Sequence, residues 1–153
     1  MRRNSIQLSR RHEWVVYGVS ALVFATGSVW AWLHYFGMTP GEFGEVSPAE
    51  TWILKAHGGA AMAMLIMLGT LFPMHVKFAW RARRNLRTGL SLCALLFLLI
   101  MTGYGLYYAG GEHLRAWTSS VHLWIGLLFV PVIALHAICG KRSRAIRNLD
   151  STR

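Results

Sequence analysis

Four long apolar stretches, separated by short polar segments, make up most of this chain of 153 residues. Each stretch is close to the ~20 residues that an α-helix needs to cross the hydrocarbon core of a bilayer. Neither acidic residues nor arginine interrupt the central part of any stretch. The pattern predicts an all-α, integral membrane protein with a single membrane domain and spans at about residues 14–36, 52–76, 89–108 and 117–139.

Tryptophan and tyrosine gather near the ends of these stretches, where amphipathic rings favour the level of the lipid headgroups. They include Trp14, Trp30, Trp32, Trp52, Trp80, Tyr107, Tyr108 and Trp117. The linkers are short, which predicts an up-down-up-down four-helix bundle whose second and fourth helices are parallel. Residues 37–51 should form a turn-rich loop, and Ser47-Pro48-Ala49-Glu50 resembles a capping box that starts the second helix.

Positive charge is concentrated on one side of this arrangement. The N-terminal segment, the second linker and the C-terminal tail carry fourteen of the sixteen Lys and Arg residues. The other side has Lys55 and Arg115, together with Glu42, Glu45, Glu50 and Glu112. The positive-inside rule therefore predicts that both termini are cytoplasmic. It also explains the net charge of +10 by membrane topology, so no nucleic-acid partner is expected.

The N-terminus and the two cysteines exclude some classes of protein. The first apolar run is too long for the core of a signal peptide and no A-x-A site follows it, so we expect an uncleaved helix. Cys93 and Cys139 both lie inside predicted spans, and neither belongs to a C-x-x-C or C-x-x-C-H motif. This excludes covalent attachment of a c-type haem, and a structural disulfide is not expected.

Four of the seven histidines lie two by two in the second and fourth apolar stretches. His57 and His75 are 18 residues apart, which is five turns at ~3.6 residues per turn. His122 and His136 are 14 residues apart, just short of four turns. Each pair should therefore share one helix face. Because the two helices are predicted to be parallel, His57 would meet His122 near the outer surface, and His75 would meet His136 near the inner surface.

Two facing imidazoles can supply both axial ligands of a low-spin haem iron. We therefore predict two haem b groups, with His57 and His122 on one iron and His75 and His136 on the other. Ionisable residues at such depth are rare in membrane helices and are usually functional. A path for a non-haem metal ion would be expected to include intramembrane carboxylates, and the spans have none.

Cations and glycines near these histidines fit the same hypothesis, although each has an ordinary alternative. The haem propionates would meet nearby cations, which also set the topology: Lys55, Arg115, Arg81, Arg83, Lys141 and Arg142. Gly58, Gly59 and Gly126 would leave a flat helix surface for a macrocycle, or would simply let membrane helices pack closely.

The two pairs of histidines differ in axial separation. The pair on the second helix spans roughly 27 Å of rise and the pair on the fourth helix roughly 21 Å. Pro73, two residues before His75, can kink the helix end and shorten the longer distance. If it does not, His12, just before the first span, is the competing inner ligand.

The chain resembles small bacterial dihaem cytochromes b in the segments LKAHGGAAMAML, LFPMHVKFAWRARRN, LIMTGYGLYYAGGEHLRAWTSSVHLWIGL and ALHAICGKR. Such proteins are related to cytochrome b561 and to the cytochrome b subunits of formate dehydrogenases and hydrogenases. The resemblance covers residues 10–142, and the two histidines of the fourth helix are its most specific part. It implies electron transfer across the bacterial inner membrane, between a quinone pool and a redox partner such as a cytochrome or dehydrogenase subunit.

One departure from the family concerns the inner haem. In the dehydrogenase-type subunits the first helix opens with a His-Trp pair, and that histidine ligates the inner haem. Alignment on Trp14 and on Thr26-Gly27 puts Glu13 in its place here, and a carboxylate is a poor substitute. The resemblance therefore favours His75 over His12, while the other three ligands carry over directly.

Filled axial positions would prevent the irons from binding substrate, so we expect an electron carrier or a redox subunit of an oxidoreductase complex. A cluster at the outer end of the third helix could bind and deprotonate a quinol, or could be an aromatic belt: Tyr104, Tyr107, Tyr108, Glu112 and His113. Two other functions stay open. One is a self-sufficient membrane reductase of a metal ion or small oxidant, and the other is a haem-free structural membrane subunit.

Overall fold

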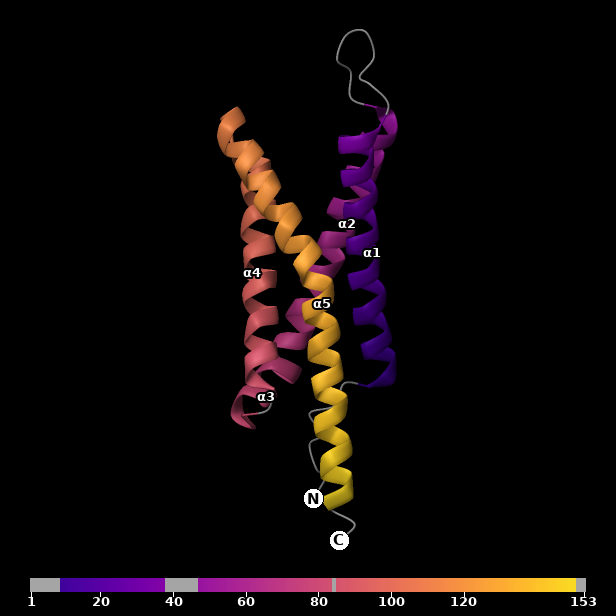
Figure 1. Ribbon diagram of the computed structural model, residues 1–153, viewed down its shortest axis with the longest axis vertical. Coiled ribbons are helices and arrows are strands. Elements are labelled where there is room, and N and C mark those ends of the chain that lie inside the picture. The colour runs from indigo at the N-terminus through magenta and orange to yellow at the C-terminus, as the bar shows by residue number, and fades with distance from the viewer. Residues whose placement is uncertain (1–8, 38–46, 84, 151–153) are drawn as a thin grey trace. The chain divides into compact units, whose positions relative to one another are not determined.

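The computed structural model describes residues 9–37, 47–83 and 85–150, and within these ranges it contains helices and no strand. The elements are α1 (Arg10–Phe36), α2 (Pro48–Leu71), the π-helical turn η1 (Phe72–Val76), α3 (Lys77–Arg81), α4 (Leu86–Tyr108) and α5 (Glu112–Asp150) (Figure 1). Most of the predicted turn-rich loop, including Glu42 and Glu45, lies outside the described residues.

Within the described residues, four helices are long and apolar enough to cross a membrane. They are α1, α2, α4 and the stretch Glu112–Ser143 of α5. The prediction of an all-α protein with four membrane-length helices is thus confirmed, and the chain is a multi-pass membrane protein that contacts lipid. The order in which the helices cross the bilayer, the side of the termini and the single domain stay predictions.

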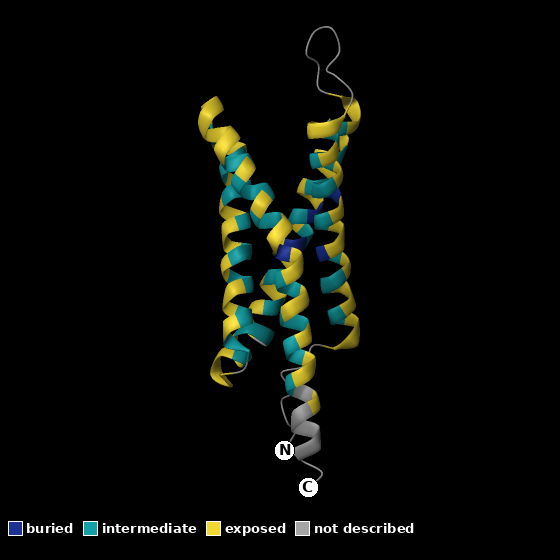
Figure 2. Ribbon diagram, in the orientation of Figure 1, coloured by how far each residue is buried: buried dark blue, intermediate teal, exposed yellow. Residues whose placement is uncertain are grey.

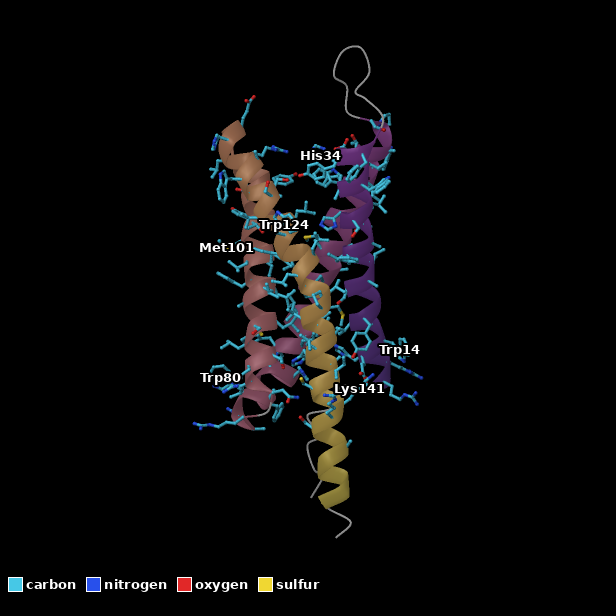
Figure 3. All side chains as sticks on the ribbon, viewed as in Figure 1. Trp14, His34, Trp80, Met101, Trp124 and Lys141 are labelled. Atoms are coloured by element: carbon cyan, nitrogen blue, oxygen red, sulfur yellow. The ribbon has the colours of Figure 1, made fainter. Side chains whose placement is uncertain are left out.

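The helix surfaces are apolar and exposed, as a bilayer allows. Trp14 is 71% exposed and Met101 is 51% exposed, and both side chains project away from the ribbon (Figure 3). Exposed positions recur along every long helix (Figure 2). Among the described residues, the only buried hydrophobic side chains are Ala60, Met64 and Phe129. Lipid chains rather than a protein core can therefore cover most of the apolar surface.

The chain divides into two compact units, of which the first comprises residues 1–78. In this unit α1 and α2 run in opposite directions. His34 near the end of α1 contacts Glu50 near the start of α2, with 2.6 Å between Nδ1 and Oε1. At the other end of the pair, His12 contacts Thr70, with 3.3 Å between Nε2 and Oγ1.

The start of α2 was predicted correctly, but the prediction of a capping box at this start is wrong. Pro48 occupies the first turn of the helix, while Ser47 makes no side-chain capping bond. The carboxylate of Glu50 instead accepts its hydrogen bond from His34, whose ring stacks on Trp30 at 4.7 Å between centroids. Glu50 therefore connects α2 to α1 instead of capping the N-terminus of its own helix.

The second unit comprises residues 79–153 and contains α4 and α5, which also run in opposite directions. Asn85, with a left-handed φ of 48°, precedes α4, and its side-chain carbonyl accepts a hydrogen bond of 3.1 Å from Ser143 on α5. Near the other end, a Cβ at Gly105 would lie 3.4 Å from the methyl group of Thr118. Small and polar residues thus bring the two helices close together, as is typical of helix pairs in membranes.

Pro73 explains why the helix changes form after α2. Proline has no N–H to donate to the carbonyl of Gly69, and its ring crowds that carbonyl. The chain responds with the π-helical turn Phe72–Val76, in which each hydrogen bond spans one residue more than in an α-helix. Such a turn rotates and advances less per residue. The five-turn spacing that places His57 and His75 on one face assumed an α-helix throughout, and the structure corrects that assumption.

Cysteine labelling tests the predicted orientation. In a variant that lacks Cys93 and Cys139, Gly111→Cys would report the junction of α4 and α5, where a side chain meets open space. Ala145→Cys would report the exposed tail of α5. Because basic segments stay in the cytoplasm, we expect a membrane-impermeant maleimide to label the first variant in intact cells. The second should react only after permeabilisation, and the opposite result would contradict the topology.

Candidate functional site

Three of the four histidines predicted as haem ligands make the same contact with the neighbouring helix. In each case the imidazole Nδ1 lies within hydrogen-bond distance of a threonine hydroxyl. The contacts are His57 with Thr26 at 3.0 Å, His122 with Thr102 at 2.8 Å, and His136 with Thr88 at 3.2 Å. The first joins α2 to α1, and the other two join α5 to α4.

The hydrogen bonds around Thr26 determine which nitrogen of His57 carries the hydrogen. The threonine hydroxyl donates its single hydrogen to the carbonyl of Leu22 at 2.8 Å, so its oxygen acts as acceptor toward the ring. The carbonyl of Val23, 3.1 Å from Nδ1, can only accept. Both neighbours require a hydrogen on Nδ1, and we therefore assign the lone pair of the neutral ring to Nε2.

The same logic applies to both histidines of the second unit. Each threonine donates to a carbonyl of its own helix and accepts from the ring. Thr102 donates to Leu98 at 2.7 Å, and Thr88 donates to Asn85 at 3.3 Å. We therefore assign the hydrogen of both rings to Nδ1 and the lone pair to Nε2, where a neutral imidazole can bind a metal.

A glycine follows each of these threonines and lies beside the histidine ring. A Cβ added at Gly27 would lie 3.0 Å from the Cε1 atom of His57, which is too close without movement of the ring. The corresponding distances are 3.5 Å at Gly103 and 3.6 Å at Gly89, which is van der Waals contact. The chain contains three Thr-Gly dipeptides, and each of them faces one of these histidines.

These contacts were not predicted from the sequence, although a signal was present. Thr88 and Thr102 are 14 residues apart, as are His122 and His136. Two antiparallel helices in contact bring equal spacings into register, so the match indicates which threonine faces which histidine. By contrast, Gly58 and Gly59, which the sequence singles out, face open space in the structure.

His12, the competing inner ligand, presents the opposite nitrogen to its threonine. Thr70 donates its hydroxyl hydrogen to the carbonyl of Met67 at 2.8 Å and accepts from Nε2 of His12 at 3.3 Å. The hydrogen of this contact therefore lies on Nε2. His12 thus contacts its threonine through Nε2, whereas the three other histidines contact theirs through Nδ1.

His75 lies in the π-helical turn η1, next to Pro73. It belongs to the first unit with His57, whereas His122 and His136 belong to the second unit. The pairing of His57 with His122 and of His75 with His136 would join residues of different units, and it stays a prediction. A π turn rises less per residue than an α-helix. It therefore shortens the axial distance between His57 and His75 and brings it closer to the distance between His122 and His136.

The aromatic residues predicted for a quinol lie together at the end of α4. The rings of Tyr104 and Tyr108 are 4.5 Å apart, and those of Tyr107 and Tyr108 are 5.7 Å apart. All three are exposed, and Tyr107 is the most exposed at 86%. Glu112, four residues after Tyr108, begins α5. The arrangement fits a headgroup-level aromatic belt as well as it fits a quinol site.

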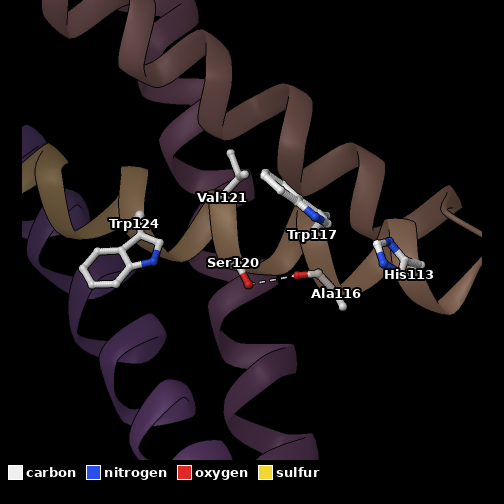
Figure 4. Close-up of a pocket in the computed structure, with 6 residues that line it drawn as sticks. All are labelled: His113, Ala116, Trp117, Ser120, Val121 and Trp124. Carbon is white, nitrogen blue, oxygen red and sulfur yellow. Dashed lines mark hydrogen bonds between the residues drawn. The ribbon is translucent and has the colours of Figure 1, made fainter.

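His113 lines an open hollow of about 450 Å³ along α5 (Figure 4). The other lining residues are Ala116, Trp117, Ser120, Val121 and Trp124. All belong to one helix, and the hydroxyl of Ser120 is bonded to the carbonyl of Ala116 at 3.0 Å. The hollow therefore offers a flat apolar ring more contact than it offers a polar ligand.

The donor set of the histidines fits haem. A haem iron takes two axial ligands, and a metal-binding imidazole commonly donates its other N–H to an oxygen of the protein. Within the described ranges, no group of three or more His, Cys, Asp or Glu side chains is placed to hold a bare metal ion. No family model, no curated protein and no solved structure matches the chain.

Proposed function

We propose that this protein is a small dihaem cytochrome b that carries electrons across the bacterial inner membrane. The observation that carries the proposal is the shared contact of His57, His122 and His136 with threonine. Each ring holds Nδ1 on a hydroxyl oxygen, which assigns the lone pair to Nε2. One haem b would bind between His57 and His122 near the outer surface, and the other between His75 and His136 near the inner surface.

The protein's own residues would position the haems and keep water away. The haems, when bound, would supply reversible one-electron chemistry. Four histidines would fill both axial positions of both irons, so neither iron would have a site for substrate. Long apolar helices between the two levels would keep the interior dry. The protein would therefore act as a carrier or a redox subunit rather than as an oxygenase.

Two observations support His75 rather than His12 as the fourth ligand. His12 commits Nε2 to Thr70, whereas the other proposed ligands commit Nδ1. His75 lies in a π-helical turn, and π turns within helices are frequent at functional sites.

The proposed partners follow from the resemblance to membrane cytochromes b. Electrons would pass between the quinone pool and a redox protein such as a cytochrome or dehydrogenase subunit. Both termini would be cytoplasmic, which places the basic residues of the tail beside the inner haem. A self-sufficient membrane reductase of a metal ion or small oxidant is the alternative within redox chemistry. A haem-free structural subunit is the alternative outside it.

Optical spectroscopy of the purified protein separates these functions. Protein from haem-replete cells should show a b-type α-band after reduction with dithionite and should contain two haems per chain. The absence of the band would contradict the proposal and favour the haem-free subunit. Reoxidation of the reduced protein by ferric chelates at a catalytic rate, without a partner, would instead favour the self-sufficient reductase.

Single alanine variants test the ligands. Replacement of His57 or His122 should remove one haem, and replacement of His75 or His136 should remove the other, because each iron loses an axial ligand. His113→Ala is the matched control, since His113 lies on α5 outside the proposed pairs. The haem content of each variant and its reduced spectrum are the measurements. Loss of a haem in His12→Ala, with both haems kept in His75→Ala, would contradict the assignment of the inner ligand.

A further inference from the structure

We propose that Thr26, Thr102 and Thr88 are positioning residues that set the reduction potentials of the haems. They act through the hydrogen bond from the imidazole Nδ1 of each ligand. The inference rests on the proposed function, because it requires that haem iron binds Nε2 of these histidines. It adds residues that would act on the haem through its ligands, by determining how strongly these ligands donate to the iron.

An oxygen that accepts from Nδ1–H makes an imidazole a stronger electron donor at Nε2. A stronger donor stabilises ferric iron more than ferrous iron and lowers the reduction potential. The dry surroundings of a membrane helix strengthen such a bond, because no water competes for the donor. Each threonine contact should therefore hold its haem at a lower potential than an apolar neighbour would.

The threonines are suited to this role because their own hydrogens are already used. Thr26 and Thr102 donate to carbonyls four residues earlier in the same helix, at 2.8 and 2.7 Å. A hydroxyl held in this way cannot rotate to donate to the ring, so its lone pairs stay directed at Nδ1–H. The helix thus determines both the tautomer and the orientation of the ring on the adjacent helix.

Thr26 works together with the glycine that follows it. A side chain at Gly27 would lie within 3.0 Å of the ring of His57. Removal of the Cβ lets the imidazole edge approach α1 until Nδ1 reaches the hydroxyl at 3.0 Å. Thr26-Gly27 therefore combines a gap for the ring with an acceptor beside the gap. At Gly103 and Gly89 an added Cβ would lie at van der Waals distance from the ring, so the threonine hydroxyl is the feature that all three positions share.

The chain also contains threonines that serve as controls. Thr118 on α5 donates to the carbonyl of Leu114 at 2.8 Å, as Thr102 does to its own helix, but its methyl group faces Gly105. Thr70 contacts His12, which is not a proposed ligand. Both carry the same hydroxyl as the three positioning residues without a contact to a proposed ligand.

The test is a redox titration of the purified, haem-loaded full chain carrying T26V, T102V or T88V. Valine keeps the branched shape and removes the acceptor. We expect T102V and T88V to raise the ratio of ferrous to ferric iron at a fixed potential roughly tenfold for one haem, a shift of ~59 mV for one electron. T26V should shift its haem less, because the carbonyl of Val23 still accepts from His57. T118V and T70V should leave both potentials unchanged.

The pattern of the shifts tests the assignment further. T26V and T102V should act on the same haem, and T88V on the other, with parallel changes in the low-temperature electron paramagnetic resonance of the ferric irons. Unchanged potentials and resonances in haem-loaded variants would overturn this inference and leave the proposed function standing. Absence of haem from the wild-type protein would overturn the proposed function itself.

Threonine-to-serine variants keep the test decisive if a valine variant loses its haem. Serine restores the hydroxyl and lacks the methyl group. A serine variant that regains haem at the wild-type potential would support the hydrogen bond as the cause. A serine variant that also loses its haem would show that packing of the methyl group is responsible, and would overturn the inference for that position.

Discussion

A polar group inside a bilayer has to find its hydrogen-bond partner within the protein, and this constraint shapes both units of the molecule. An imidazole N–H buried without an acceptor costs roughly 1–3 kcal/mol, and no water is present to relieve it. His57, His122 and His136 meet the constraint with a threonine on the adjacent helix. The threonine can serve because its own hydrogen goes to a helix carbonyl, which costs the helix none of its backbone bonds.

The same contacts determine how the helices of each unit are aligned. A hydrogen bond at about 3 Å tolerates no sliding of one helix past the other by even one residue, which would be a displacement of ~1.5 Å. In the second unit, two such bonds 14 residues apart connect α4 and α5. A Cβ added at the glycines beside these threonines would lie at van der Waals distance from the histidine rings. The polar contacts therefore determine the register between the two helices, which contacts between apolar surfaces alone would not specify.

Hydrophobic pattern was sufficient to predict the four membrane-length helices, because span length and apolar composition are properties of each segment by itself. The threonine contacts could not be read in the same way, since they depend on the register between two helices. Thr26-Gly27 served to align the chain with the cytochromes b that it resembles, but its contact appears only with His57 opposite. Pro73 predicted an irregular helix end, yet proline alone does not distinguish a kink from a π turn. Glu50 fitted a capping box, but the side chain of His34 competes successfully for it.

The first unit departs from the pattern of the second at the position of His12, which bears on the choice of His75 as the fourth proposed ligand. Thr88 lies 14 residues before Thr102, and the residue 14 before Thr26 is His12. The second unit thus has a threonine on its first helix and a histidine on its second, whereas the first unit has His12 facing Thr70. In the first unit the histidine of this contact therefore lies on the first helix and the threonine on the second, the reverse of the second unit. The proposed ligand His75 lies beyond Thr70, in the π-helical turn Phe72–Val76 that contains Pro73.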